Sequence, residues 1–402
     1  MRIQPILLCG GVGARLAPLS TPDHPKPFLP FRGGKSLYQA TLARCASAQF
    51  LPPVIIGNDS HRYTMLNQLR DIEANYAAIL LEPSAKNTSL AIMRAVNYLL
   101  RNRNNAEFLL FLPSDHAIAD RNMWAADVTA LANALPANGI GLLGIRPTHA
   151  HSGYGYITHA PSQHAIHPVQ QFLEKPADAN MRWHTPTMLW NSGMVLARPE
   201  ALRAACIAQA PMCWEAAETS VARGQPDFEF FACVEAPHCI PLPFDRAVLE
   251  KTEALYVKPT ACGWSDIGDG EAWDAHAEHT LLAQLTQPRR IDRPWGYFFV
   301  TSHSATRIEK TLFVYPGARL SLQRHAQRGE DWHVISGNAR VQCGEEIRRL
   351  AAGDKAHIPA GAWHRLENVG EGVLRVHEVQ SGAPHEADIE RAADDYGRAQ
   401  IR

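Results

Sequence analysis

The hydrophobic pattern up to residue 145 alternates between short apolar runs and longer amphipathic stretches. The short runs are typical of buried strands, and the stretches between them repeat apolar residues at the helical period. Strand alternating with helix predicts an α/β domain with a mostly parallel sheet covered on both faces, and ligands bind such sheets beyond the carboxyl ends of the strands. Strands are expected at residues 4–9, 53–57, 77–82, 107–112 and 140–145, and helices at 60–73, 88–101 and 124–135.

The pattern changes after residue 289, where short β-like runs are separated by glycine and proline. Closely spaced strands with turn residues between them are typical of a small all-β barrel or sandwich. Residues 283–292 predict a linker, which divides the chain into domains at residues 1–282 and 293–402. Strands are expected at residues 295–301, 311–315, 332–336, 339–343, 355–358 and 374–379, and a short helix at 386–394.

Composition narrows the class of protein further. A net charge of -1 leaves no basic field that would hold a nucleic-acid backbone. No apolar run is long enough to span a membrane, and none has the form of a signal peptide, so we expect a cytoplasmic protein. The eight cysteines include no CxxC pair and are expected to be reduced, mostly buried thiols.

A glycine-rich loop follows the first expected strand. Gly10, Gly11 and Gly13 allow backbone N–H groups to approach a phosphate closely. Arg15 and Lys26 add two positive charges that can neutralise a triphosphate and the charge that develops as pyrophosphate leaves. The loop therefore predicts a site for nucleotide phosphates.

Two aspartates are candidate ligands for a metal ion. Asp115 lies just beyond the expected strand at residues 107–112, where a carboxylate suits Mg²⁺, an ion that prefers oxygen ligands and keeps contact with substrate phosphates. Asp266 is the natural second carboxylate for the same ion. Together they predict a Mg²⁺ site beside the phosphate loop.

The loop sequences GGVGARLAPLS at 10–20 and PKPFL at 25–29 resemble the signature of sugar-nucleotide pyrophosphorylases, and more narrowly that of mannose-1-phosphate guanylyltransferases. The likeness implies a Rossmann-like, GT-A-like domain that transfers a nucleotidyl group from GTP to mannose 1-phosphate, giving GDP-mannose and pyrophosphate. Further motifs follow in the family's order, namely EP and KNT within 82–88, LPSDH at 112–116, GYGYI at 153–157, FLEKP at 172–176, WNSGM at 190–194, EKT at 250–252 and WSDIG at 264–268.

The resemblance also implies roles for individual residues. Lys86 stands where the family usually has arginine, so the nucleobase preference stays open, with GTP as the leading candidate. The implied catalytic residues are Arg15, Lys26, Asp115 and Asp266, the implied nucleotide-binding residues are Gly10, Gly11, Gly13, Glu82, Asn87 and Thr88, and the implied sugar-binding residues are Gly155, Glu174, Lys175, Asn191 and Asp245.

The second domain carries the two-motif spacing of a cupin, a double-stranded β-helix. Alternation along paired strands points Gln323, His325, Glu330 and His364 into one barrel mouth. Two imidazoles with a carboxylate and an amide suit Zn²⁺ or another divalent transition metal. The spacing therefore predicts a second metal site, separate from the first.

The motifs RPWG at 293–296, HRLEN at 364–368 and EVQSG at 378–382 make this cupin resemble type II mannose-6-phosphate isomerase, which follows this kind of guanylyltransferase in one chain. The likeness implies interconversion of hexose 6-phosphates, with Lys310, Arg328 and Arg365 holding phosphate or assisting proton transfer. A homodimer is expected. Two alternatives stay open: a transferase whose cupin serves dimerisation or effector binding, and a non-catalytic sugar-nucleotide sensor.

Overall fold

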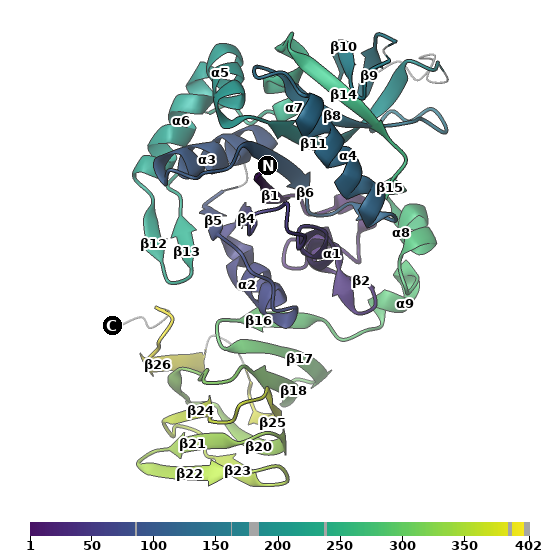
Figure 1. The fold of residues 1–402 in the computed structure, drawn as a ribbon. Helices are drawn as coiled ribbons and strands as arrows, with labels where there is room; N and C mark the ends of the chain where they lie inside the picture. The colour runs from purple at the N-terminus through teal and green to yellow at the C-terminus, as the bar shows by residue number, and fades with distance from the viewer. Residues whose placement is uncertain (85–86, 162, 177–184, 237–238, 385–387, 398–402) are drawn as a thin grey trace. The chain divides into compact units, whose positions relative to one another are not determined.

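A computed structural model describes residues 1–84, 87–161, 163–176, 185–236, 239–384 and 388–397, and the chain forms two compact units, Met1–Leu285 and Thr286–Arg402 (Figure 1). The segment expected to be a linker is partly structured, because it begins within helix α9 (Leu281–Leu285) and ends within strand β16 (Arg290–Arg293). Within the described ranges, no helix is both long enough and apolar enough to cross a membrane.

The first unit is built on a mixed sheet. Its strands are β1 (Ile3–Cys9), β4 (Val54–Asn58), β5 (Ala78–Glu82), β6 (Phe108–Pro113), β8 (Ile140–Ile145), β9 (Tyr156–His159), β10 (His167–Leu173), β11 (Met188–Ala197), β12 (Gln225–Asp227), β13 (Phe230–Ala232) and β14 (Leu255–Thr260). Among the described residues they pair in the order β12-β13-β5-β4-β1-β6-β11-β8-β14-β10-β9.

The direction of the strands changes across this sheet. The neighbours β13-β5-β4-β1-β6 run parallel, as the alternation of strand and helix predicts. Strand β11 pairs antiparallel with both β6 and β8. In its described residues, the chain between β8 and β11 passes through strands β9 and β10, and parallel neighbours usually need a helical crossover. The sheet is therefore parallel from β13 to β6, mixed beyond β6, and antiparallel again at its edge strand β12.

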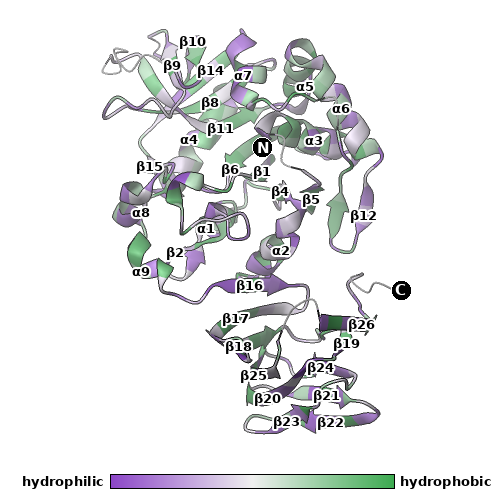
Figure 2. Ribbon diagram, turned by 180° about the vertical axis from the view of Figure 1, so that it is seen from behind, coloured by the Kyte–Doolittle hydropathy of each residue, from purple (hydrophilic) through white to green (hydrophobic). Residues whose placement is uncertain are grey.

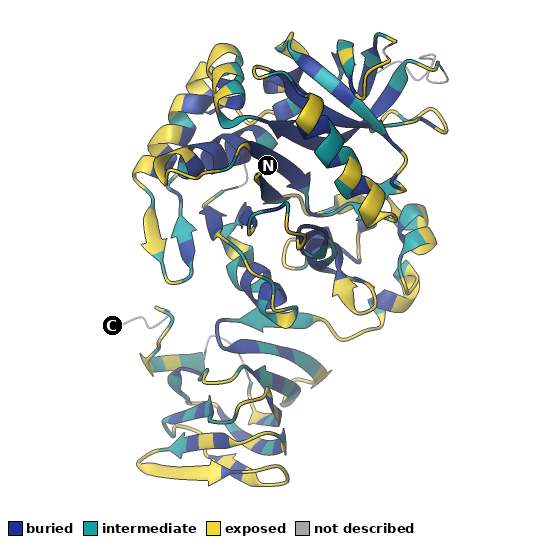
Figure 3. Cartoon of the chain, in the orientation of Figure 1, coloured by how far each residue is buried: buried dark blue, intermediate teal, exposed yellow. Residues whose placement is uncertain are grey.

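Side chains alternate along the central strands and build one core on each face of the sheet. The face that contains Ile6 is covered by α3 (Asn87–Arg101), α5 (Pro199–Gln209) and α6 (Pro211–Ala222). The face that contains Leu7 is covered by α1 (Leu37–Arg44), α2 (Arg62–Asp71) and α4 (Arg121–Ala134). Hydrophobic residues follow the central strands in Figure 2, and the same strands are mostly buried in Figure 3.

Shorter elements connect these layers. The capping box of Ser36 and Gln39 starts α1, and the side chain of Asp120 accepts from two backbone N–H groups at the start of α4. The remaining elements of this unit are η1 (Ala14–Leu16), η2 (Lys26–Phe28), β2 (Pro30–Arg32), β3 (Lys35–Ser36), η3 (Asp59–His61), β7 (Ala117–Ile118), α7 (Phe244–Ala247), η4 (Leu249–Lys251), β15 (Trp264–Ser265) and α8 (Gly270–His276).

The second unit is an all-β barrel of two antiparallel sheets. After β16 its strands are β17 (Gly296–His303), β18 (Arg307–Val314), β19 (Leu322–His325), β20 (Arg328–Ser336), β21 (Ala339–Cys343), β22 (Glu346–Leu350), β23 (Lys355–Ile358), β24 (His364–Asn368), β25 (Leu374–Gly382) and β26 (Ile389–Ala393). One sheet has the order β16-β17-β18-β25-β20-β23 and the other β22-β21-β24-β19-β26. Buried apolar residues such as Trp332, Val341 and Val376 fill the space between them.

Two expectations about local structure are wrong. The helix expected at 386–394 is strand β26 in its described part, because this segment pairs with β19 and tertiary pairing overrides the helix propensity of its sequence. The expectation of reduced thiols fails for Cys213 and Cys239, which form a disulfide across 26 residues of sequence, a proximity that spacing alone does not reveal. The free cysteines of the described chain are buried, apart from half-buried Cys343.

Candidate functional sites

The glycine loop after β1 packs directly against Lys26. Gly13 has a left-handed backbone with φ +76°, and a Cβ at this position would lie 2.5 Å from Cβ of Lys26. The backbone N–H of Lys26 donates to the carbonyl of Val12 at 3.1 Å. The loop can hold the lysine this closely only because residue 13 has no side chain.

Replacing Gly13 with alanine should lower the free energy of unfolding by about 2–4 kcal/mol, because backbone strain adds to the displacement of Lys26. Thermal denaturation measures this loss. Gly33→Ala is the matched control, since Gly33 is also left-handed, with φ +59°, but has open space around it. The control should lose only about 1 kcal/mol; equal losses in the two variants would contradict the packing argument.

Lys26 joins the two aspartates that were expected to share an ion. Its ammonium lies 2.7 Å from Oδ2 of Asp115 and donates to the backbone carbonyl of Asp266 at 2.5 Å. Asp115 follows β6, and Asp266 follows β15, which pairs with β7 just beyond Asp115. This short strand pair brings two segments about 150 residues apart in the sequence together, and Lys26 contacts both aspartates beside it.

The environment of Asp115 keeps its carboxylate ionised. Burial opposes ionisation, but the charge of Lys26 and the neighbouring His116 outweigh it and hold the pKa of Asp115 below its usual value. The indole N–H of Trp264 donates to Nδ1 of His116 at 3.1 Å. Because an indole nitrogen can only donate, Nδ1 must accept, and the proton of neutral His116 lies on Nε2, 3.7 Å from Oδ1 of Asp115.

Asp266 is oriented by two further side chains. The hydroxyl of Tyr154 donates to Oδ1 of Asp266 at 2.8 Å, and the guanidinium of Arg15 lies 3.6 Å from Oδ2. The side chain of Arg15 is 60% exposed, whereas that of Lys26 is 7% exposed. The site therefore has one buried cation, Lys26, and one exposed cation, Arg15, whose side chain has room to move with a bound ligand.

A second group of polar side chains lies farther along the same cavity. The amide of Asn191 donates to Oδ1 of Asp245 at 2.8 Å, and Nζ of Lys175 lies 3.0 Å from Oε1 of Glu174. A Cβ at Gly155 would lie 2.8 Å from Oε2 of Glu174. Burial and the nearby charge of Glu174 raise the pKa of Asp245 to about 6. This arrangement offers both donors and acceptors to the hydroxyls of a sugar.

Asp245→Asn should stabilise the protein by about 1–3 kcal/mol at pH 8 and by much less at pH 4. The folded-state pKa of Asp245, about 6, lies above that of an exposed aspartate, so its stabilising contribution is present at low pH and is lost as the pH rises through 6. Asparagine cannot ionise, so the variant keeps its stability as the pH rises. Melting curves of the wild type and the variant at both pH values test this prediction, with Asp23→Asn at an exposed position as the control. A larger gain in stability at pH 4 than at pH 8 would contradict the prediction.

These groups line one cavity of about 270 Å³ at the carboxyl ends of β1 and β6. Thr88 belongs to it through its position at the start of α3, where its hydroxyl accepts from the backbone N–H of Phe244 at 2.9 Å. The cavity brings together ten of the residues expected from the sequence: Arg15, Lys26, Thr88, Asp115, Gly155, Glu174, Lys175, Asn191, Asp245 and Asp266.

The other expected nucleotide-binding residues do not line this cavity, among them Gly10, Gly11, Gly13 and Asn87. Glu82 is buried, and its carboxylate accepts from the guanidinium of Arg94 at 2.8 Å, so it ties β5 to α3. Lys86 lies outside the described residues.

Three polar aromatic residues of this cavity, His116, Tyr154 and Trp264, have no role in the expectations from the sequence. Each lies inside one of the motifs LPSDH, GYGYI and WSDIG, but neutral aromatic side chains give no charge pattern that would single them out. In the structure Tyr154 donates to Asp266, and Trp264 fixes the ring of His116 beside Asp115.

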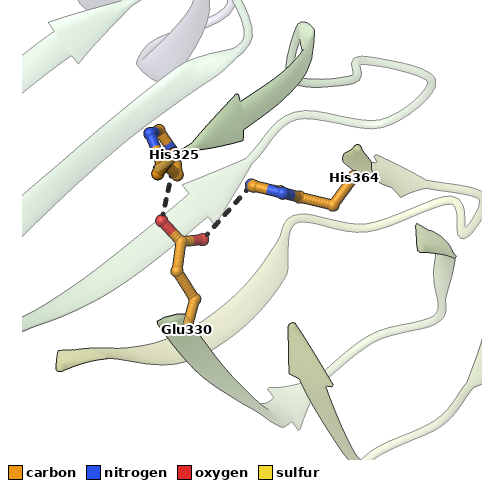
Figure 4. Close-up of side chains that lie close together, drawn as sticks. All are labelled: His325, Glu330 and His364. Carbon is orange, nitrogen blue, oxygen red and sulfur yellow. Dashed lines mark ion pairs between the residues drawn. The ribbon is translucent and has the colours of Figure 1, made fainter. Parts of the chain in front are cut away.

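The second unit contains a cluster of His325, Glu330 and His364 (Figure 4). One ligand atom from each residue lies within 4.8 Å of the others. Nε2 of His325 lies 3.2 Å from one oxygen of Glu330, and Nε2 of His364 lies 3.5 Å from the other. Gln323 is opposite His364 in the register of β19 and β24, and its amide nitrogen lies 3.4 Å from Nε2 of His325. Three strands of the barrel thus converge on one point.

The donor set of this cluster fits a divalent metal ion. Nδ1 of His364 lies 2.9 Å from the carbonyl of Ala362, and Nδ1 of His325 lies 3.3 Å from the carbonyl of Asp388. An Nδ1–H bonded to a carbonyl leaves the lone pair of Nε2 to bind a metal. At His325 this lone pair faces the guanidinium of Arg328, which lies 3.2 Å away and which a metal ion would displace. Nε2 of His364 is buried and has no hydrogen-bond partner in the described chain, as expected for a ligand atom.

Lys310 and Arg328 line a cavity of about 60 Å³ beside this cluster. Arg365 does not, because it follows His364 on a strand and points to the opposite face, where it donates to the carbonyl of Ala393 at 3.1 Å. Its expected place in the site is therefore corrected. Glu378 and Gln380 also line the cavity, and neither is among the residues expected there. Glu378 lies on the strand expected at 374–379, and Gln380 falls just beyond its expected end.

Comparison with known families divides the chain at the same place as the fold. A family model described as nucleotidyl transferase matches residues 4–281, and one described as mannose-6-phosphate isomerase C-terminal matches residues 282–394. The first match covers more than half of the chain.

Individual relatives match along nearly the whole length. The xanthan biosynthesis protein XanB of Xanthomonas campestris is 34% identical over 98% of this chain and 99% of its own, and the mannose-1-phosphate guanylyltransferase RfbM of Salmonella typhimurium is 32% identical over 95% of each. The alignment with XanB spans 471 positions, whereas this chain has 402 residues, so that relative carries positions that this chain lacks. A crystal structure described as a mannose-1-phosphate geranyltransferase from Thermus thermophilus is similar with a TM-score of 0.59 and 27% identity, covering 71% of this chain and 80% of its own.

Proposed function

This chain belongs to the nucleotidyltransferase family of mannose-1-phosphate guanylyltransferases that carry a C-terminal mannose-6-phosphate isomerase domain, and from that premise we propose that its first unit makes GDP-mannose and pyrophosphate from GTP and mannose 1-phosphate. The observation that carries this proposal is the single cavity that has Lys26, Asp115 and Asp266 at one end and Asn191 and Asp245 at the other. The first end suits phosphates, and the second suits a hexose.

In this reaction an oxygen of the sugar phosphate attacks the α-phosphorus of the nucleotide, and the bond to the β-phosphate breaks. Catalysis by such a site comes from positioning and from neutralising charge, without a covalent intermediate. Lys26 and Arg15 would neutralise the phosphates, while Glu174 and Asn191 would hold the sugar. Mg²⁺ bound by Asp115 and Asp266 would supply further positive charge to the phosphates.

Release of pyrophosphate from GTP and mannose 1-phosphate, with Mg²⁺ present, tests this function. The same assay with the other nucleoside triphosphates and with glucose 1-phosphate would establish which nucleobase and which sugar the enzyme prefers. Failure to release pyrophosphate from any pair would refute the proposal and favour a non-catalytic sensor.

We propose that the second unit interconverts mannose 6-phosphate and fructose 6-phosphate. The support is the convergence of His325, Glu330 and His364, with Gln323 beside them, on a cavity that also contains Lys310 and Arg328. These ligands suit Zn²⁺ or another divalent transition metal, which would polarise a carbonyl oxygen of the sugar when bound. Arg328 and Lys310 would hold the phosphate or the charge that develops on oxygen.

Conversion of fructose 6-phosphate, measured before and after chelation and after adding back Zn²⁺ or Co²⁺, tests the isomerase. No conversion under any of these conditions would leave the barrel as a module for dimerisation or effector binding. The expected homodimer is tested by sedimentation of the purified chain.

A further inference from the structure

Glu378 is a second buried carboxylate on the cavity of the barrel. It lies on β25, where the strand register places it between Lys310 on β18 and Trp332 on β20. The amide of Gln380 donates to Oε1 of Glu378 at 2.7 Å, and Nζ of Lys310 lies 3.8 Å from the same oxygen. These two partners are a neutral amide and one cation, neither of which belongs to the expected metal ligands.

The other buried carboxylate, Glu330, is occupied by donors on both oxygens. Trp332 donates to it at 3.1 Å, Gln380 at 3.2 Å and Arg328 at 3.4 Å. The Nε2 atoms of His325 and His364 lie 3.2 and 3.5 Å from its two oxygens. Both of its oxygens are therefore engaged by hydrogen-bond donors and face the two histidines, which places this carboxylate as a metal ligand and leaves the role of base to another group.

We propose that Glu378 is the base that carries the proton between C1 and C2 of the hexose 6-phosphate, an inference that rests on the isomerase function proposed above. Three observations support this role: Glu378 lines the cavity, it is not one of the three residues of the metal cluster, and it has an ammonium beside it to face negative charge on the substrate. The sequence alone did not name a base for this reaction.

The proposed step balances without an oxidant or a reductant. The carboxylate of Glu378 takes the proton from C2 of the open-chain aldose. The electron pair of that C–H bond forms the C1–C2 double bond, and the π pair of the carbonyl moves to O1, giving an enediolate near Lys310. Protonated Glu378 then returns the proton to C1 while the proton on O2 moves to O1, and the new carbonyl at C2 completes the ketose.

The charges around Glu378 support this role. Burial and the nearby charge of Glu330 raise the pKa of Glu378 to about 7, while Lys310 and Arg328 act in the opposite direction. A base is most effective when its pKa lies near the working pH.

Glu378→Gln tests the proposal in the full-length chain loaded with the divalent ion that gives the wild type its highest isomerase activity. We expect isomerisation and the exchange of solvent deuterium into the sugar to fall together, by about 10²- to 10³-fold. Metal content, the melting temperature and the binding of a non-reactive hexitol 6-phosphate should stay near wild-type values. Glu309→Gln is the control, because Glu309 lies on the neighbouring strand and pairs with Arg307 and His377, away from the cavity.

The possible results separate two kinds of failure. A wild-type protein with no isomerase activity would overturn the proposed function itself. An active wild type with a Glu378→Gln variant that keeps more than about a tenth of the activity would overturn the role of Glu378, since loss of a general base costs about 100-fold or more. Loss of metal from the variant would also overturn the role of Glu378 as the base, by making Glu378 part of the metal site.

If the glutamine variant does not fold, Glu378→Asp should fold and show the same joint fall in isomerisation and exchange. Normal activity in the aspartate variant would again overturn the role of Glu378.

Discussion

Lys26→Ala is expected to lower kcat/KM for nucleotidyl transfer by more than about 10³-fold and to leave isomerisation unchanged. The ammonium of Lys26 is buried and lies 2.7 Å from Asp115, so no mobile surface cation can replace it. Its removal takes away the charge that faces the phosphates and also leaves Asp115 without its closest partner. Pyrophosphate release and fructose 6-phosphate conversion, measured on one preparation, give both results.

Lys35→Ala is the matched control, because Lys35 is an exposed lysine in the same part of the chain. It should transfer at the wild-type rate. The melting temperature of the Lys26 variant must show that the first unit is folded. A folded variant that keeps more than about a tenth of the transfer activity would contradict the role of Lys26, because one preorganised donor is worth about 100-fold or more.

Glu330→Gln should remove the divalent metal from the barrel and lower isomerisation by more than about 10³-fold, since Lewis-acid assistance contributes several kcal/mol. The substitution keeps the shape of the side chain but removes the anion that lies between His325 and His364. Metal analysis after dialysis and the isomerase assay measure the two effects. Transfer of the nucleotidyl group should be unaffected.

Glu346→Gln, on the exposed strand β22, is the control for a loss of charge in the same unit. It should retain both metal and activity. A Glu330→Gln protein that binds the metal as tightly as the wild type would show that the ion is held elsewhere.

The fold was predictable from the sequence where each segment carried its own pattern. The strands that became β1, β4, β5, β6 and β8 are apolar runs bounded by polar or turn residues, and the structure confirms them. What sequence reasoning could not supply was the partner of each strand. The antiparallel insertion of β11 and the pairing of β26 with β19 depend on contacts between segments far apart in the chain.

Some of the site residues could likewise be predicted from the sequence, and others could not. Lys26 and Asp115 could be proposed from residue type and position beyond a strand, and the structure brings them into contact. The resemblance implies that Glu82 binds the nucleotide, whereas the structure pairs it with Arg94, a buried partner that spacing cannot identify. The resemblance also implies a place for Arg365 in the barrel site, but alternation along a strand puts its side chain on the face opposite to that of His364. Glu378 was missed for lack of any charge pattern that separates a buried glutamate from an exposed one.

Each unit has a cavity of its own, and the two substrates proposed for these cavities carry phosphate on different carbons. The barrel would work on phosphate at C6, whereas the first cavity would accept it at C1. The product of one reaction therefore cannot be handed directly to the other, and it must leave the chain to have its phosphate moved. Joining the units in one polypeptide fixes the ratio of the two units at one to one. The fusion would therefore keep the amounts of the two enzymes equal, and it would not pass an intermediate from one site to the other.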